Sequence, residues 1–341
     1  MKTTEYKDSE VGRIPADWKV AQLKDLTDII TGATPSTSIN EYWNGDIPWM
    51  SSGELNMKLV RSVYGRITQK GYDSCGTHMI PPLCVLIGLA GQGKTRGTAA
   101  INYISLCTNQ SIASILPSSY FDSFFLYYWL DNQYYNLRML SAGDGGRGEL
   151  NKQLLLNLWV PLPPLKEQKA IANSLSSIDS LISSLDELIE KKRMIKEGLM
   201  RELLTGKKRL ARFNGEWKQI TLGEYCSIIM GQSPSSTFYN QNGVGLPLIQ
   251  GNSDFENRKS IIRTYTSYIT KTCNQNDTIM SVRAPVGAVG KASSDSCLGR
   301  GVCAFRTDTD FLFYYMQYNE DKWGQFSKGS TFDSINRDDL C

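Results

Sequence analysis

The sequence lacks most of the side chains and spacings on which enzyme active sites depend. His78 is the only histidine among 341 residues, so a Ser-His-Asp mechanism would rest on that one imidazole. The eight cysteines form no C-x-x-C pair, so the paired spacing of a zinc site is missing. No G-x-G-x-x-G run follows an expected strand, so no dinucleotide-binding turn is predicted. We therefore predict no catalytic residues, no metal ligands and no cofactor bound by this chain.

Long apolar runs and a strong charge imbalance are also lacking. No stretch approaches the roughly 18 apolar residues of a membrane-spanning helix. The polar start, residues 1–8, has no apolar core of an export signal, so we expect a cytoplasmic protein with reduced thiols. The 37 basic and 34 acidic residues give a net charge of +3, which is compatible with nucleic-acid binding but does not by itself indicate it.

What the sequence does contain is an internal repeat. When the chain is shifted by 199 positions, Trp18 coincides with Trp217 and Gly32 with Gly231. Nine of the 31 residues at positions 18–48 are identical to their counterparts. Further matches follow at shorter offsets, namely Phe125–Tyr128 with Phe311–Tyr314, and Leu150–Lys152 with Ile335–Arg337. Two similar domains with different interiors suggest a protein that recognises two different targets with one type of domain.

Both repeats have the composition and the short apolar runs of mixed α/β domains. They are rich in Gly, Ser, Thr and aromatic residues, and short β-like runs such as 84–87 and 278–282 lie between turn residues. The aromatic runs 121–128 and 311–318 indicate a buried helix late in each repeat. We predict an α+β protein with three parts, a first domain at 1–158, a connecting segment at 159–210 and a second domain at 211–341.

The connecting segment is predicted to be one long helix at about 165–204. Gly198 is its only glycine and it contains no proline, while Pro163-Pro164 precede it and Gly206 follows it. Apolar residues recur at spacings of three and four, which is typical of a coiled-coil seam. They are Ile171, Leu175, Ile178, Ile182, Leu185, Ile189, Ile195, Leu199 and Leu203. We expect this stripe to pack against another long helix; the alternative is two ordinary core helices with a break near Gly198.

Residues 88–95 match the phosphate-binding pattern G-x-x-x-x-G-K-[ST] and follow an apolar strand. Such a loop must open directly into a helix, whereas Gly97 and an extended-looking run come next. The corresponding segment of the second repeat, 281–292, retains a strand, a glycine turn and a lysine but loses the phosphate pattern. We interpret both as hairpin tips that carry basic residues, and keep a nucleotide-binding enzyme as the alternative.

Polar and basic residues in glycine-flanked loops form the candidate binding set. Arg and Lys suit guanine edges and phosphates, and Asn and Gln suit adenine, so these are the side chains that a DNA-reading loop needs. The candidates are Ser52, Gln92, Lys94, Arg96 and Arg147 in the first repeat, and Gln250, Asn252, Arg283, Lys291 and Arg300 in the second. For any single one of them, an ordinary surface or turn role is an equally good interpretation.

The layout resembles the DNA-specificity subunits of type I restriction–modification systems. The resemblance rests on the entry elements at 12–20 and 214–218 and, most specifically, on Leu162-Pro163-Pro164-Leu165-Lys166-Glu167-Gln168 followed by Ile171 and the long helix. This run is similar to the family's P-P-x-x-E-Q-x-x-I element, and the likeness extends over essentially the whole chain.

The resemblance implies two target-recognition domains, each reading one half of a bipartite DNA site, and a helical spacer that sets their separation. It implies a subunit without catalytic activity that docks methyltransferase subunits, which use S-adenosylmethionine to methylate adenine. Restriction subunits, which use ATP and magnesium, would join that assembly to cleave DNA.

One feature departs from the family pattern. The second repeat reaches Leu340 without a second P-P-x-x-E-Q element or a second long helix. We therefore expect the stripe to pair with another copy, a separately encoded half-subunit or the methyltransferase subunits. A remaining alternative is an assembly scaffold that no longer reads DNA.

Overall fold

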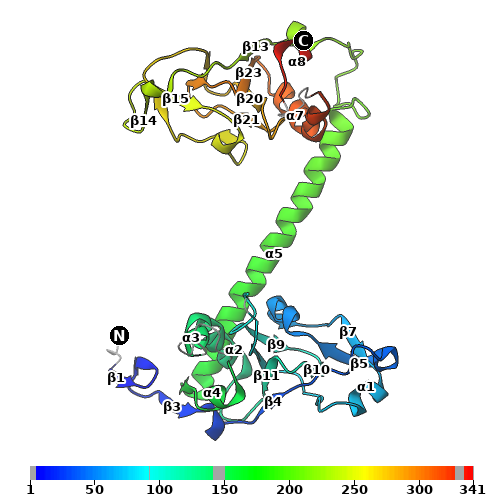
Figure 1. Ribbon diagram of the computed structural model, residues 1–341, viewed down its shortest axis with the longest axis vertical. Coiled ribbons are helices and arrows are strands. Elements are labelled where there is room, and N and C mark those ends of the chain that lie inside the picture. The colour runs from blue at the N-terminus through cyan, green and yellow to red at the C-terminus, as the bar shows by residue number, and fades with distance from the viewer. Residues whose placement is uncertain (1–4, 92, 141–149, 327–333, 341) are drawn as a thin grey trace. The chain divides into compact units, whose positions relative to one another are not determined.

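A computed structural model describes residues 5–91, 93–140, 150–326 and 334–340 (Figure 1). The chain divides into two compact units, residues 1–185 and 186–341, and the long helix α5 (Leu165–Leu203) continues from the first into the second. The predicted boundaries at 158 and 210 therefore differ from this division, which falls within the helix.

The first unit contains two main sheets and a group of short helices. Its principal sheet has the strand order β4-β11-β8-β9-β6, and a second has the order β10-β5-β7. The strands of the unit are β1 (Tyr6–Ser9), β2 (Gly12–Pro15), β3 (Lys19–Gln22), β4 (Ile29–Thr31), β5 (Trp43–Met50), β6 (Leu59–Val60), β7 (Gly65–Ile67), β8 (Val85–Gly88), β9 (Ala99–Asn102), β10 (Cys107–Thr108), β11 (Ile112–Ile115) and β12 (Trp159–Leu162). The helices before α5 are η1 (Leu23–Asp25), η2 (Asn40–Tyr42), η3 (Ser52–Met57), α1 (Gln69–Asp73), α2 (Ser123–Asn132), α3 (Tyr134–Leu140) and α4 (Lys152–Leu156).

The principal sheet of the first unit is buried on both faces. Strand β8 is a continuous apolar run, and its residues alternate between two cores. Val85 and Ile87 pack in a cluster with Leu126 and Leu130 of α2, whereas Leu86 packs in a second cluster with Leu55 of η3. Continuous rather than alternating hydrophobicity is what a strand covered on both sides requires.

The second unit repeats this plan. Its principal sheet has the order β13-β23-β20-β21-β17-β16, and the second has the order β14-β18-β15-β22-β19. The strands are β13 (Ser227–Met230), β14 (Tyr239–Asn240), β15 (Leu246–Ile249), β16 (Phe255–Glu256), β17 (Lys259–Ser260), β18 (Tyr265–Thr266), β19 (Thr272–Cys273), β20 (Thr278–Ser281), β21 (Val289–Lys291), β22 (Ser296–Leu298) and β23 (Val302–Arg306). The helices are α6 (Leu222–Tyr225), η4 (Ser236–Phe238), η5 (Asn252–Asp254), α7 (Phe311–Tyr318), η6 (Glu320–Phe326) and α8 (Arg337–Leu340).

Strand pairing shows that the sequence repeat is a structural repeat. In both principal sheets the strand that comes first in the sequence pairs antiparallel with the strand that comes last, as β4 with β11 and β13 with β23. In both second sheets a parallel pair occurs, β5 with β10 and β15 with β22. The predicted pair of similar mixed α/β domains is thus confirmed at the level of strand order.

The matching glycines Gly32 and Gly231 have the same structural role. A Cβ atom at Gly32 would overlap the carbonyl oxygen of Thr108, and one at Gly231 would overlap that of Gly299. Both glycines follow the first strand of the principal sheet, where the chain passes closely over the end of another strand. Only a residue without a side chain fits there, which explains why both repeats carry glycine.

The two late aromatic runs form helices as predicted, but α2 begins at Ser123 rather than at Phe121. The reason is Asp122, whose carboxylate accepts hydrogen bonds from the backbone N–H groups of Phe124 and Phe125 and so caps the helix. The predicted single long helix is confirmed, because α5 is continuous over 39 residues, and the alternative of a break near Gly198 is wrong. No helix among the described residues is both long enough and apolar enough to cross a membrane.

Candidate nucleic-acid interface

A polar cleft of about 420 Å³ lies at one edge of the second unit, where four loops meet. The loops follow β13, β15 and β20 and precede β23. Antiparallel pairing with β23 brings the ends of β13 and β20 to its start, and β15 ends beside the end of β22, its parallel partner, just before the same loop. The cleft is lined by Ser233, Gln250, Gly251, Asn252, Ser253, Arg283, Ala284, Pro285, Arg300 and Gly301. Four of the five second-repeat candidates, namely Gln250, Asn252, Arg283 and Arg300, are therefore brought together.

Hydrogen bonds between the loop backbones hold the cleft. The N–H of Gly299 donates to the carbonyl of Ile249 at 2.7 Å, and that of Val282 donates to Gly301 at 2.9 Å. The buried carboxylate of Asp254 accepts from the Gln250 N–H at 2.6 Å. The backbone is thus held in place by its own contacts, and this leaves the exposed side chains available to a ligand.

The charge of the cleft suits a polyanion. None of its lining residues is acidic, whereas Arg283 and Arg300 both project there and are exposed. Arg300 stands between two glycines, and a Cβ at Gly301 would overlap the Gln250 carbonyl, so the close loop packing depends on that residue. Two guanidinium groups can donate hydrogen bonds to phosphates or to acceptor atoms on base edges, and the neighbouring amide of Gln250 can both donate and accept.

The first unit builds its loops with the same backbone bonds. The N–H of Asn109 donates to Met50 at 3.1 Å, and that of Leu89 donates to Ser111 at 2.8 Å. Glu54 accepts from the Ser51 N–H at 2.8 Å, as Asp254 does for Gln250. These matched hydrogen bonds establish which loop residues of the first unit are equivalent to which loop residues of the second.

By this correspondence Gln110 of the first unit is the counterpart of Arg300. Gln110 is exposed, and its side-chain oxygen accepts a hydrogen bond from the Thr34 hydroxyl at 2.6 Å. The prediction missed Gln110 because no glycine flanks it. The available signal was the alignment of residues 107–112 with 297–302, in which Cys107 matches Cys297. Ser52, a first-repeat candidate, lies beside Ser51 at the start of η3 and is half-buried.

Lys94 and Arg96 lie in the turn between β8 and β9, which form an antiparallel hairpin. Among the described residues, Thr95 is followed by a turn and then by strand β9, without a helix. The nucleotide-binding alternative therefore loses its structural basis. The tip is held by α3, because Arg138 donates to the carbonyl of Gly93 at 2.8 Å and Tyr134 donates to that of Lys94 at 3.1 Å.

A cleft of about 590 Å³ is lined by Lys94, Tyr134 and Arg138 together with Lys58, Asp131 and Tyr135, whereas Arg96 is not among its lining residues. Lys94 is thus displayed in a basic and aromatic surface whose shape depends on Arg138, a residue that the prediction missed. The other first-repeat candidates, Gln92 and Arg147, lie outside the described residues.

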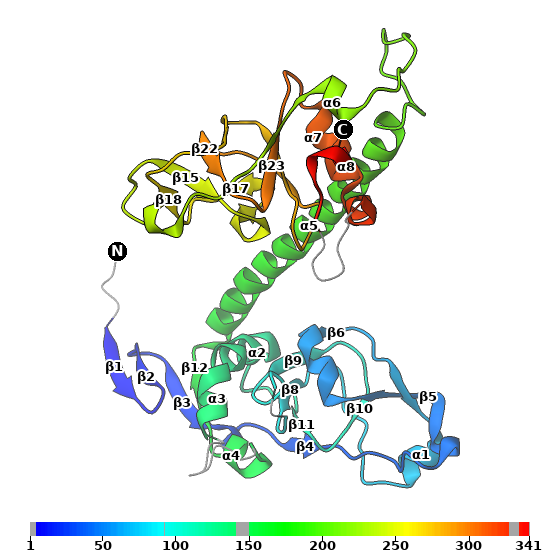
Figure 2. The ribbon, with the colours of Figure 1, turned by 45° about the horizontal axis from the view of Figure 1, so that its top comes forward.

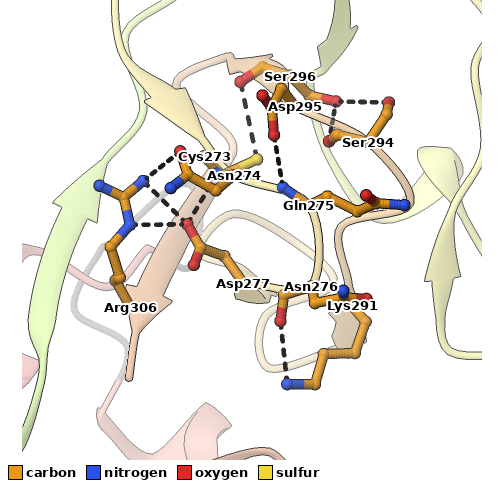
Figure 3. Close-up of polar contacts among 10 residues, drawn as sticks. All are labelled: Cys273, Asn274, Gln275, Asn276, Asp277, Lys291, Ser294, Asp295, Ser296 and Arg306. Carbon is orange, nitrogen blue, oxygen red and sulfur yellow. Dashed lines mark hydrogen bonds and ion pairs between the residues drawn. The ribbon is translucent and has the colours of Figure 1, made fainter. Parts of the chain in front are cut away.

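Lys291 was predicted at a hairpin tip, and its placement there is wrong. It ends strand β21, where its ammonium group donates to the Asn276 carbonyl at 3.0 Å (Figure 3). The same ammonium group pairs with Asp310 at 2.8 Å. The ring of Phe313 lies 5.3 Å from the same nitrogen. The turn between β20 and β21 spans 282–288, so glycine at 290 belongs to the strand and does not mark the tip.

Figure 3 also shows Arg306 bound to Asp277, whose carboxylate is mostly buried, in the segment before β20 that also contains Asn276. Lys291 therefore belongs to an internal polar network of the second unit and lies outside the cleft-lining set. No group of His, Cys, Asp and Glu suited to a metal ion occurs among the residues that the structure describes.

The apolar stripe of α5 is exposed, as expected of a helix that packs against a partner. Ile171 and Leu203 are half-buried within the chain, and between 41% and 56% of each intervening stripe residue is exposed. These residues are Leu175, Ile178, Ile182, Leu185, Ile189, Ile195 and Leu199. Serine and charged residues occupy most of the remaining surface of the helix, so the stripe has the composition of a helix–helix interface.

Two related domains with polar loop clusters, joined by a long helix with an open apolar seam, define a class of two-site binding proteins. The family model described as the type I restriction modification DNA specificity domain matches residues 15–192 and again 214–341. The chain therefore belongs to the type I restriction–modification DNA-specificity family.

Relatives and solved structures agree with this assignment. The chain is 29% identical to a protein of Methanocaldococcus jannaschii assigned as the MjaX specificity subunit of a type I restriction enzyme, over 99% of this chain and 85% of that protein. It is 33% identical to the MjaIX specificity subunit of the same organism, over 55% of this chain and 44% of that protein. The fold resembles the S subunit of a type I restriction–modification system from M. genitalium, with a TM-score of 0.58 and 19% identity over 90% of this chain and 78% of that one.

Proposed function

We propose that this chain is a non-catalytic specificity subunit that directs a type I restriction–modification complex to a bipartite DNA target. The observation that carries the proposal is the pair of loop clusters with equivalent backbones and different side chains. One carries Arg300 and the other Gln110 at the same position, so each cluster would recognise a different half-site. Recognition of two different half-sites requires different base-contacting side chains on an equivalent backbone.

The partners follow from the same assignment. Double-stranded DNA occupies the loop clusters, and methyltransferase subunits carrying S-adenosylmethionine supply the methyl group. Restriction subunits with ATP and magnesium supply cleavage, so this chain itself needs no cofactor. We place its action in the cytoplasm, where bacterial and archaeal DNA lies. The open seam of α5 is covered by another long helix, from a second copy, a half-subunit or the methyltransferase subunits.

The test is methylation mapping in cells that express this chain with its methyltransferase subunit. We expect methylated adenine at a two-part motif with a fixed gap, because two readers on one helix must engage both halves at once. Cells without the chain should lack the mark. A methyltransferase that is active with another specificity subunit but leaves no mark with this chain would support the scaffold alternative.

A further inference from the structure

The first turns of α5 attach to the first unit through one face. Gln168 is 1% exposed and Ala172 is 2% exposed, and Ser176 and Asp179 follow at helical spacing on the same side. Figures 1 and 2 show helix α2 beside this part of α5. The exposed apolar seam that begins at Leu175 lies on a different face, so α5 has an attachment face as well as a seam.

Gln168 makes the inner contact of this attachment. Its side-chain oxygen accepts a hydrogen bond from the Asp122 N–H at 2.8 Å, and its amide nitrogen donates to the Pro163 carbonyl at 2.8 Å. Asp122 in turn caps α2 through its carboxylate. One buried amide therefore joins the start of α2, the proline step and the first turn of α5. Removing it would take away the partner of the buried Pro163 carbonyl and of the partly buried Asp122 N–H, which is costly.

Tyr128 makes the outer contact about three turns further along α5. Its hydroxyl donates to the carboxylate of Asp179 at 2.7 Å and lies 3.1 Å from the hydroxyl of Ser176. Burial, together with the hydrogen bond to Asp179, raises the pKa of Tyr128 to about 12, so the hydroxyl stays a donor at neutral pH. Contacts at two points along one helix restrain both its tilt and its rotation about its own axis.

We propose that Gln168, together with Tyr128, is a positioning residue that sets the gap between the two DNA half-sites. It does so by fixing the direction and rotation of α5 against α2. This inference rests on the proposed function. Neither residue lies in the loop clusters, so the pair would control spacing without contributing to base recognition.

The geometry makes the gap sensitive to small movements at this attachment. From Asp179 to Leu203 the helix continues for 24 residues, which is about 36 Å at 1.5 Å per residue. A tilt of about 5° at the attachment would move the far end by roughly 3 Å, close to the ~3.4 Å rise of one base pair. Each base pair also rotates the half-site by about 35°, so the rotational restraint matters as much as the tilt.

The experiment compares methylation maps of Gln168→Leu, Tyr128→Phe and Ser180→Ala, each expressed with the methyltransferase subunit. Gln168→Leu removes the inner contact at similar volume, and Tyr128→Phe removes only the outer hydroxyl. Ser180→Ala is the matched control, since that hydroxyl bonds only to the Ser176 carbonyl of its own helix. The readout is the ratio of marked sites with gaps one base pair longer or shorter to sites with the wild-type gap.

We expect this ratio to rise at least several-fold in both attachment variants and to stay at the wild-type level in Ser180→Ala, with both half-site sequences unchanged. A merely destabilised protein would lose marks at all gaps together. If Gln168→Leu fails to accumulate, Tyr128→Phe carries the test. Wild-type gap selectivity in folded attachment variants would overturn the inference, whereas absence of any two-part mark with the wild-type chain would overturn the proposed function itself.

Discussion

Arg300 and Gln110 occupy equivalent loops with the same backbone bonds, yet they offer different chemistry to a ligand. Arg300 carries a fixed positive charge and a planar donor fork, whereas Gln110 offers one donor and one acceptor group. Arg pairs preferentially with guanine, and Gln with adenine. At this position the two recognition units therefore differ in side-chain chemistry on an equivalent backbone.

Replacing these two residues should alter opposite halves of the recognised motif. We expect Arg300→Ala to relax base preference in one half-site and Gln110→Ala to relax it in the other, each by about 1–3 kcal/mol, or roughly 10–100-fold in discrimination. Methylation mapping of both variants measures this directly. Arg337→Ala removes the same charge from α8 outside the cleft and should leave both halves unchanged. Equal loss at every sequence would instead identify these side chains as phosphate contacts.

The cysteines offer a second test at the residue scale. Six of the seven described cysteines are buried, and Cys75 is half-buried. Burial raises the pKa of Cys84 and Cys273 to about 12 and that of Cys107 to about 11. Because the thiolate is the reactive form, these three should react with iodoacetamide at pH 8 about 100-fold or more slowly than in guanidinium. Cys75 should be labelled first, as peptide mass spectrometry can show; equal native labelling at Cys84 would contradict the burial.

At the scale of single elements, α5 is the clearest success of sequence reasoning. Its 39 residues, its start after Pro163-Pro164 and its exposed seam were all predictable, because helix period and caps are local signals. The hairpin tips were less predictable. Lys291 lies in a strand because β21 pairs with β20, and that pairing depends on residues far from its own glycines.

Charged substitutions in the seam should abolish assembly without unfolding the chain. Ile182→Glu with Ile189→Glu places two carboxylates where about 1.5–3 kcal/mol per apolar side chain would otherwise be gained on burial. We expect the mass of the complex formed with the methyltransferase subunits, measured by light scattering, to fall while circular dichroism is unchanged. Ser184→Glu adds a charge to the opposite face of the same helix and should have no effect. Assembly that survives the double variant would mean that the seam is not an interface.

At the scale of the whole molecule, the chain consists of one fold plan used twice. Both units place the first strand beside the last in the principal sheet, and both place a parallel pair in the second sheet. Because the backbone hydrogen bonds of the loops match, equivalent loop positions in the two units carry different side chains. This arrangement allows each recognition unit to change its loops while the connecting helix keeps its own contacts.

The sequence by itself determined the two-fold repeat, the α+β class, the long helix and its seam, and the absence of familiar catalytic patterns. Each of these depends on composition, period or identity at a fixed offset, all of which can be read along the chain. Only the tertiary structure decided which polar residues share a cleft. Gln250, Arg283 and Arg300 are brought together by strand pairing across more than one loop, and the backbone hydrogen bonds established that Gln110 is the counterpart of Arg300. The attachment by Gln168 and Tyr128 likewise joins two helices whose contact leaves no periodic trace in the sequence.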